Sequence, residues 1–131
     1  MVYKNWNRNL KLDIKHQKGF VLRDNENQVL GFVTYFMNQG VAQIGWMGVH
    51  PDQHRKSIGS QLLEALEESL SSYGIKELLV STLGDSVDYE PYARTRSFYR
   101  KNGFVDYKKI NHLENPECEE ELVLRKDLNG P

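Results

Sequence analysis

The hydrophobic pattern of the chain changes its period near residue 50, and this change limits the folds that the chain can form. Between residues 19 and 49, apolar and β-branched runs are separated by two polar turns, at residues 24–27 and 38–40. From residue 58 to residue 70, leucines and an isoleucine recur three and four positions apart, as on one face of a helix. We therefore expect a β-meander followed by an amphipathic helix.

The rest of the chain alternates between strand and helix patterns. Gly74 suits a left-handed helix end, Pro91 suits the first turn of a second helix, and Asn102 and Gly103 end that helix. The expected strands are 10–14, 19–23, 29–37, 41–49, 77–83, 104–110 and 121–125, and the expected helices are 57–73 and 91–101. This order predicts one α/β domain over residues 1–131, an α+β mixed sheet with helices packed on it.

Composition excludes several classes of protein. The 17 Lys and Arg nearly balance the 18 Asp and Glu, which argues against a general nucleic-acid binder. The second predicted helix carries four cations: Arg94, Arg96, Arg100 and Lys101. We expect them to solvate a helix face. A single cysteine and the absence of an apolar run of about 20 residues predict a cytoplasmic protein without a membrane partner.

The segment between the third meander strand and the first helix has the chemistry of an anion site. A helix N-terminus presents unpaired N–H groups and a partial positive charge. Arg55, Lys56 and His54 reinforce that charge, and Gly59 allows a ligand to approach the backbone. The segment suits a pyrophosphate, although the residues alone fit an ordinary charged helix start nearly as well. Neither a Walker loop nor a dinucleotide-binding glycine fingerprint is present.

Two segments resemble the GNAT N-acyltransferase superfamily. The first, with Val49-x-Pro51, His54-Arg55-Lys56-Ser57-Ile58-Gly59 and Leu62-Leu63, resembles the Arg/Gln-x-x-Gly-x-Gly/Ala motif that wraps the pyrophosphate of coenzyme A. The second, Phe98-Tyr99-Arg100-Lys101-Asn102-Gly103-Phe104, resembles the family's Phe-Tyr-x-x-x-Gly-Phe. The resemblance covers residues 19–124. It departs from the family at His54, at Ser57, which stands for the first glycine, and at Tyr92 and Thr95, where many members carry Asn and Ala.

This resemblance implies an N-acetyltransferase that moves an acetyl group from acetyl-CoA to a primary amine by direct attack in a ternary complex. It implies that the Met47 N–H faces the thioester carbonyl and that Tyr99 protonates the leaving thiolate. Gly48 and Val49 would pair with the pantetheine arm where the neighbouring strands splay. The implied acetyl-CoA-binding residues are Met47, Gly48, Val49, His54, Arg55, Lys56, Ser57, Ile58, Gly59, Ser60, Tyr92 and Tyr99.

Several alternatives stay open at this point. Tyr99 could instead fill the core between helix and sheet, as we expect of Phe98. Gln43 occupies a position where some relatives carry a catalytic Glu, so the base is undetermined, and deprotonation through water fits best. His50 and His54 do not make a metal site, because Pro51 disfavours helical backbone at His50, and no metal is expected.

The resemblance also implies a shortened N-terminal region, because the family normally has helices before the meander and only 18 residues precede Gly19. An acceptor site open on that side would suit a small-molecule, peptide or protein amine, or a partner subunit that completes it. A homodimer is compatible with such a fold. The alternative function is a non-catalytic sensor that binds acyl-CoA without turnover.

Overall fold

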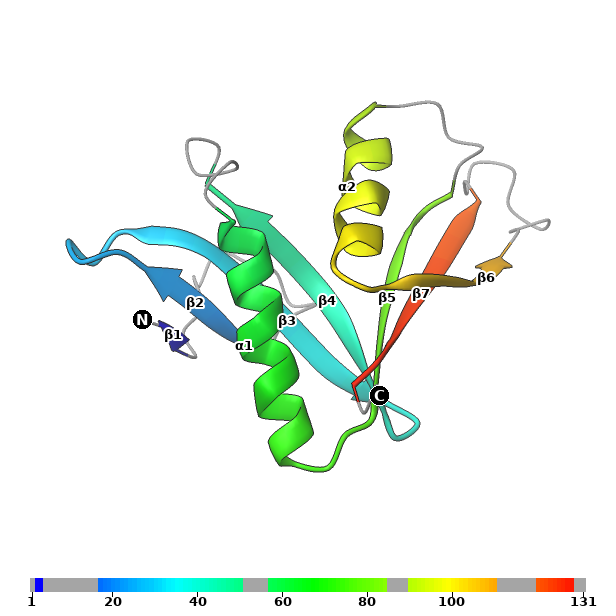
Figure 1. Cartoon of the computed structure of the whole chain (residues 1–131), viewed down its shortest axis with the longest axis horizontal. Helices are drawn as coiled ribbons and strands as arrows, with labels where there is room; N and C mark the ends of the chain where they lie inside the picture. Colours follow the sequence, from blue (N-terminus) through cyan, green and yellow to red (C-terminus); the bar gives the residue numbers. More distant parts are fainter. Residues whose placement is uncertain (1, 4–16, 51–56, 85–89, 111–119, 129–131) are drawn as a thin grey trace. The chain divides into compact units, whose positions relative to one another are not determined.

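The computed structural model describes residues 2–3, 17–50, 57–84, 90–110 and 120–128 (Figure 1). The chain forms two compact units, Met1–Lys76 and Glu77–Pro131, which are described separately. Each unit combines antiparallel strands with one α-helix. The α+β composition expected from the sequence is therefore found in both.

The first unit is an antiparallel sheet covered by a helix. Its strands are β1 (Val2–Tyr3), β2 (Lys18–Arg23), β3 (Val29–Asn38) and β4 (Val41–Val49), in the order β1-β2-β3-β4. Helix α1 (Ile58–Ser72) packs on β2, β3 and β4 (Figure 1). The predicted meander and first helix are confirmed.

The largest difference from the sequence prediction lies at the N-terminal side of this sheet. Strand β1, which pairs with β2, was not predicted. The predicted strand at residues 10–14 lies outside the described residues. A strand of two residues shows no hydrophobic periodicity, so the sequence offers no signal for it.

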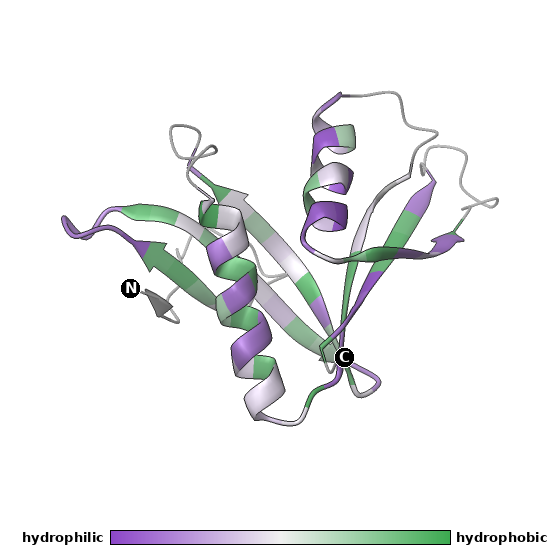
Figure 2. Cartoon of the chain, in the orientation of Figure 1, coloured by the Kyte–Doolittle hydropathy of each residue, from purple (hydrophilic) through white to green (hydrophobic). Residues whose placement is uncertain are grey.

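Helix α1 buries the face that its sequence spacing predicts. Apolar and polar residues alternate around it (Figure 2). Its buried residues include all five of the predicted apolar positions, Ile58, Leu62, Leu63, Leu66 and Leu70. At its other end, the N–H of Ile75 donates to Leu70 O at 3.0 Å and that of Gly74 donates to Ser71 O at 2.9 Å, with Gly74 at φ 80°. This is the predicted left-handed helix end.

The second unit contains β5 (Glu77–Leu83), α2 (Glu90–Lys101), β6 (Val105–Ile110) and β7 (Glu121–Asp127). Strand β7 lies between β5 and β6 and is antiparallel to both (Figure 1). Strands β5 and β7, helix α2 and the residue before β6 contribute the buried apolar side chains of this unit: Leu78, Val80, Tyr99, Phe104, Leu122, Val123 and Leu124. The predicted helix 91–101 and the last three strands are confirmed to within two residues.

The prediction that the α2 cations all solvate a helix face is wrong for Arg96. Arg96 is only 5% exposed, and its Nη1 donates to Gly84 O at 3.0 Å. Arg100 is exposed and forms a two-point ion pair with Asp106, with both N–O distances at 2.9 Å. That ion pair lowers the pKa of Asp106. Among the described helices, none has the length and apolarity needed to cross a bilayer.

Candidate functional site

Strand β4 contains a β-bulge at its middle. The register between β3 and β4 shifts by one residue between Val33 and Tyr35, so Thr34 lies opposite two residues of β4, Gly45 and Trp46. The Thr34 side chain occupies this irregularity, and the Trp46 N–H donates to Thr34 Oγ1 at 2.7 Å. A bulge of this kind changes the direction of the backbone groups that follow it.

The residues after the bulge direct their N–H groups alternately to the two edges of β4. The His50 N–H donates to Leu30 O at 2.8 Å, so these two residues form a hydrogen-bonded pair of the ladder. Because hydrogen-bonded and non-hydrogen-bonded pairs alternate in an antiparallel ladder, Gly48 belongs to the former class and Met47 and Val49 to the latter. The N–H groups of Met47 and Val49 therefore point to the edge of β4 opposite β3, whereas that of Gly48 points toward β3.

The beginning of α1 presents backbone N–H groups without a side-chain cap. Ser57 precedes the helix with φ 59° and ψ 24°, a left-handed conformation, and its side chain makes no capping hydrogen bond. The first hydrogen bond of the helix runs from the Gln61 N–H to Ser57 O at 3.0 Å. In helical geometry, the preceding N–H groups of Ile58, Gly59 and Ser60 have no acceptor within the helix. A left-handed residue before such N–H groups is also the geometry of an anion-binding nest.

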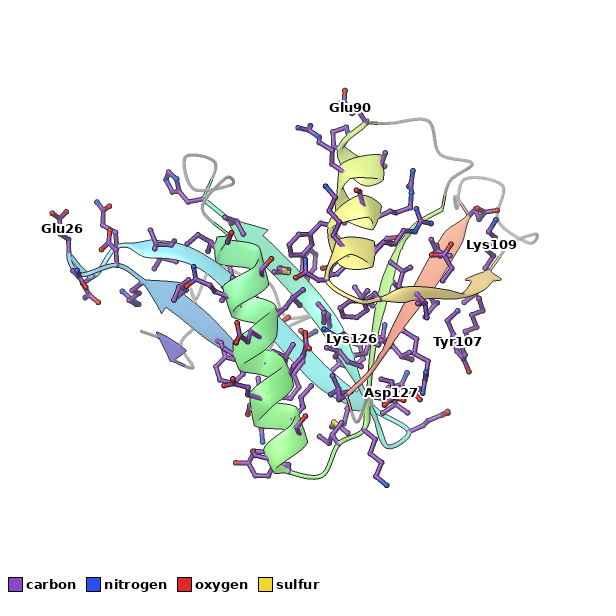
Figure 3. All side chains as sticks on the ribbon, viewed as in Figure 1. Glu26, Glu90, Tyr107, Lys109, Lys126 and Asp127 are labelled. Carbon is purple, nitrogen blue, oxygen red and sulfur yellow. The ribbon has the colours of Figure 1, made fainter. Side chains whose placement is uncertain are left out.

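The first turn of α1 differs from that of α2 in charge. No acidic residue stands in the first turn of α1, whereas α2 begins with Glu90 (Figure 3). A carboxylate at a helix N-terminus is stabilised by the helix dipole and would compete with an anionic ligand. Within the described residues, the start of α1 is therefore the helix end whose electrostatics favour a bound phosphate.

The end of β4 and the start of α1 meet over Gly31. A methyl group at Gly31 would lie 2.9 Å from Gly48 O, 3.1 Å from Ile58 Cγ2 and 3.0 Å from Leu62 Cδ1. Glycine thus allows α1 to approach the sheet closely at this point. The structure in this way brings together the predicted pantetheine-binding strand and the predicted pyrophosphate-binding helix turn. The predicted residues His54, Arg55 and Lys56 lie outside the described residues.

The predicted site residues of the second unit lie on α2. Tyr99 is 5% exposed, and its ring packs edge to face against Phe98 at 5.2 Å and against Phe104 at 5.4 Å between centroids. Burial raises the pKa of Tyr99 to about 12, so the phenol keeps its proton at neutral pH. Phe98, which we expected in the core, is only partly buried, so Tyr99 is the more deeply packed ring of the two.

Other predicted positions are more exposed. Tyr92 lies two helical turns before Tyr99 on α2 and is 38% exposed. Gln43 lies on β4 and is partly buried. In the described part of the chain, no group of three His, Cys, Asp or Glu side chains is placed to hold a metal ion.

Comparison with known proteins identifies the family. The family model of the acetyltransferase (GNAT) domain matches residues 15–106, which is more than half of the chain. The chain belongs to the GNAT acetyltransferase family. Among curated proteins, this GNAT chain is 27% identical over 97 residues to YxbD, an uncharacterized protein of Bacillus subtilis (strain 168). The match covers 73% of the chain and 56% of that relative's length, so the chain spans little more than half of it.

Solved structures share the GNAT fold. A GNAT-family acetyltransferase from Elizabethkingia anophelis with acetyl-CoA bound superimposes with a TM-score of 0.76 at 14% identity and covers 97% of both chains. A GNAT-family protein from Desulfovibrio desulfuricans gives a TM-score of 0.74 at 19% identity, over 86% of this chain and 69% of the other. The predicted fold class and the predicted superfamily are thus confirmed.

The sequence prediction missed the residues that shape the bulge, Gln17, Thr34, Gly45 and Trp46. A glycine inside a strand pattern is a known signal of a bulge, and Gly45 could have been taken as one. Thr34 gives no such signal, because a threonine in a run of β-branched and aromatic residues is ordinary for a strand.

Proposed function

We propose that the protein is an N-acetyltransferase that transfers an acetyl group from acetyl-CoA to a primary amine. The observation that carries this proposal is the start of α1, where a left-handed Ser57 precedes backbone N–H groups in a turn without an acidic residue. This arrangement fits a diphosphate at the position of the motif that resembles the GNAT pyrophosphate loop. We also infer that both units belong to one domain, since the family match at residues 15–106 runs through both.

The proposed reaction is a direct attack. The neutral amine nitrogen bonds to the thioester carbonyl carbon, the carbon–sulfur bond breaks, and coenzyme A leaves as a thiolate that takes up a proton. The amine loses one proton in exchange. An alkyl amine titrates near 10.4, so the fraction that is neutral at pH 7 is small and the reaction needs assistance in removing the proton.

We assign the oxyanion donor to Met47. Its N–H points to the edge of β4 opposite β3, as the alternation of the ladder requires. A backbone N–H fixed by a strand requires no reorganisation when negative charge develops on the carbonyl oxygen, and such a donor contributes about 10²–10³ in kcat in other enzymes. The assignment depends on the direction of this N–H.

We assign the general acid to Tyr99. A tyrosine phenol keeps its proton at neutral pH and can donate it to the thiolate as that charge develops; burial, which raises the pKa of Tyr99 to about 12, makes it a weaker acid than an exposed tyrosine. Its ring packs edge to face against Phe98 and Phe104, which holds the phenol in place. The proton that the amine releases through water restores the phenol.

One residue favours the alternative function, a non-catalytic sensor of acyl-CoA. Gln43 stands where some relatives carry a catalytic Glu, and an amide cannot accept the proton of the amine. A protein that binds acetyl-CoA but lacks a route for this proton would act as a sensor. If water carries this proton away, Gln43 is no obstacle to catalysis, and only a measurement of turnover separates the enzyme from the sensor.

The test measures free thiol released from acetyl-CoA in the presence of a panel of small-molecule, peptide and protein amines. Thiol release that depends on an amine, with acetylated amine as the second product, supports the enzyme. We expect Tyr99→Phe to lower kcat about 10²-fold and to leave acetyl-CoA affinity within a factor of about three. Binding of acetyl-CoA without turnover on any amine supports the sensor, and absence of binding contradicts both.

A further inference from the structure

We propose that Thr34 is a positioning residue for the transfer reaction. Its hydroxyl, together with Gln17, holds the bulge in β4 and thereby fixes the direction of the Met47 N–H. This inference rests on the proposed function, because it concerns how the oxyanion donor of that reaction is aimed. Thr34 itself is not assigned any contact with a substrate.

The hydroxyl of Thr34 both donates and accepts a hydrogen bond inside the protein. Thr34 is 0% exposed. Its Oγ1 donates to Gln17 Oε1 at 2.6 Å and accepts from the Trp46 N–H at 2.7 Å. The three residues come from β3, from β4 and from the segment before β2. We call this group the bulge clamp.

The bulge clamp fits only because the neighbouring residue, Gly45, has no side chain. A methyl group at Gly45 would lie 2.8 Å from Thr34 Oγ1 and would overlap Gln17 Oε1. Neither contact is possible for real atoms, so a side chain at this position would displace the amide, the hydroxyl or both. Gly45 and the clamp thus depend on each other.

The bulge determines which edge of β4 the Met47 N–H faces. The β3–β4 hairpin closes at the Asn38–Val41 pair with two residues between, Gln39 and Gly40, both at positive φ. Such a two-residue loop makes the closing pair hydrogen-bonded. In an unbroken ladder the pairs would alternate from this closing pair, and residue 47 would lie opposite Phe32 in a hydrogen-bonded pair. Its N–H would then face β3.

The observed register contains one more residue on β4, which reverses this outcome. With the bulge, Met47 lies opposite Val33 in a non-hydrogen-bonded pair, and its N–H faces the other edge. The extra residue also leaves the Trp46 N–H next to Thr34, whose hydroxyl accepts it. Without that acceptor, the bulged register leaves the Trp46 N–H without its partner on β3, which favours the regular ladder. In the regular ladder the Trp46 N–H turns to the other edge of β4 and the Met47 N–H faces β3, the wrong direction for the oxyanion.

The experiment compares Thr34→Val, which has nearly the same shape but no hydroxyl, with Thr34→Ser, which retains it. Three quantities are measured: kcat and KM with the best amine of the panel, the affinities for acetyl-CoA and for coenzyme A, and amide hydrogen exchange at Trp46. We expect Thr34→Val to lower kcat about 10- to 100-fold, with KM for the amine unchanged. Its preference for acetyl-CoA over coenzyme A falls as well, and exchange at Trp46 becomes at least tenfold faster. Thr34→Ser stays within about threefold of the wild type.

The affinity ratio separates a positioning role from a merely structural one. Coenzyme A lacks the acetyl carbonyl, so a general loosening of the fold weakens both ligands equally, whereas a misdirected Met47 N–H weakens acetyl-CoA alone. Equal losses for both ligands, a wild-type kcat in Thr34→Val, or equal defects in Thr34→Val and Thr34→Ser would each overturn the proposal.

Two further arms keep the result interpretable. If Thr34→Val does not fold, Gln17→Met takes its place, and the same fall in kcat supports the clamp while a wild-type rate overturns it. If the wild-type protein transfers acetyl to no amine, the proposed function fails and the catalytic role of Thr34 fails with it. If the wild-type protein is active and exchange at Trp46 is unchanged in Thr34→Val, the bulge clamp is overturned while the proposed function stands.

Discussion

Ser57 shows how a single residue can hold a conformation that its side chain disfavours. It lies at φ 59°, where Cβ crowds the backbone and glycine is the usual occupant. The family motif has glycine at this place, so the departure at Ser57 retains the conformation that glycine would adopt. The conformation is therefore a requirement of the helix start, and the serine tolerates it.

Substitutions at Ser57 are expected to reverse the ordinary helix preferences. We expect Ser57→Gly to be as stable as the wild type or up to about 1 kcal/mol more stable, and Ser57→Val to lose about 1–2 kcal/mol. The control is Ser71, inside α1, where Gly should destabilise by about 0.5–1 kcal/mol. Urea unfolding measures all three free energies of unfolding. The same effect of glycine at both positions would contradict the argument.

Tyr99 links burial to a pH dependence of stability. Its pKa rises from 10.0 to about 12 because burial disfavours the phenolate. A raised pKa in the folded state means that the stabilisation is fully present below pH 10 and is lost as the pH rises toward 12. At about 1.4 kcal/mol per pH unit, this loss amounts to about 3 kcal/mol.

The comparison of the wild type with Tyr99→Phe isolates this loss. Phenylalanine keeps the packing against Phe98 and Phe104 but does not titrate. We expect the difference in free energy of unfolding between the two proteins to shift by about 2 kcal/mol in favour of Tyr99→Phe between pH 10 and pH 12, with the rest of the loss falling outside this range. Tyr35, whose pKa is also raised by burial, is present in both proteins and cancels. Parallel curves over this range would show that the Tyr99 hydroxyl is solvated in the native protein.

At the scale of elements, the approach of α1 to the sheet depends on one glycine. The leucine face of α1 was predictable, because a helix period of 3.6 residues leaves a clear sequence pattern. The role of Gly31 was not, because a glycine in a strand has several meanings and its neighbour Ile58 is 27 residues away in the chain. The bulge at Thr34 was missed for the same reason, since it is defined by a partner strand.

A double-mutant cycle tests the contact between Gly31 and α1. We expect Gly31→Ala to destabilise the protein by about 1–3 kcal/mol, because the new methyl group meets Leu62 Cδ1 and Ile58 Cγ2 as well as Gly48 O. Leu62→Val removes the Cδ atoms and should relieve part of the overlap. The double mutant should therefore be less destabilised than the sum of the two single mutants by about 0.5 kcal/mol or more. Strict additivity in thermal or urea unfolding would place the strain elsewhere.

At the scale of the whole molecule, the near-zero net charge means that the attraction for an anionic ligand depends on local groups. With 17 basic and 18 acidic residues, the protein has no net field that attracts a polyanion such as coenzyme A. We therefore expect the affinity to come from local groups: the start of α1, the cations Arg55 and Lys56 that precede it in the sequence, and the backbone of β4. The family and the fold were predictable because two motifs occur in order along the chain, whereas the direction of each N–H group depends on the register between strands.

Thermal unfolding with ligand fragments tests where that affinity lies. A ligand at 100 times its Kd stabilises the folded state by about 2.7 kcal/mol, which corresponds to a rise in Tm of roughly 5–10 °C for a chain of this size. We expect this rise with acetyl-CoA and with dephospho-coenzyme A, which retains the diphosphate. Pantetheine, which lacks the diphosphate, should give no rise at the same concentration. An equal rise with pantetheine would mean that β4 supplies the affinity, and the N–H groups that follow Ser57 would lose the role proposed for them.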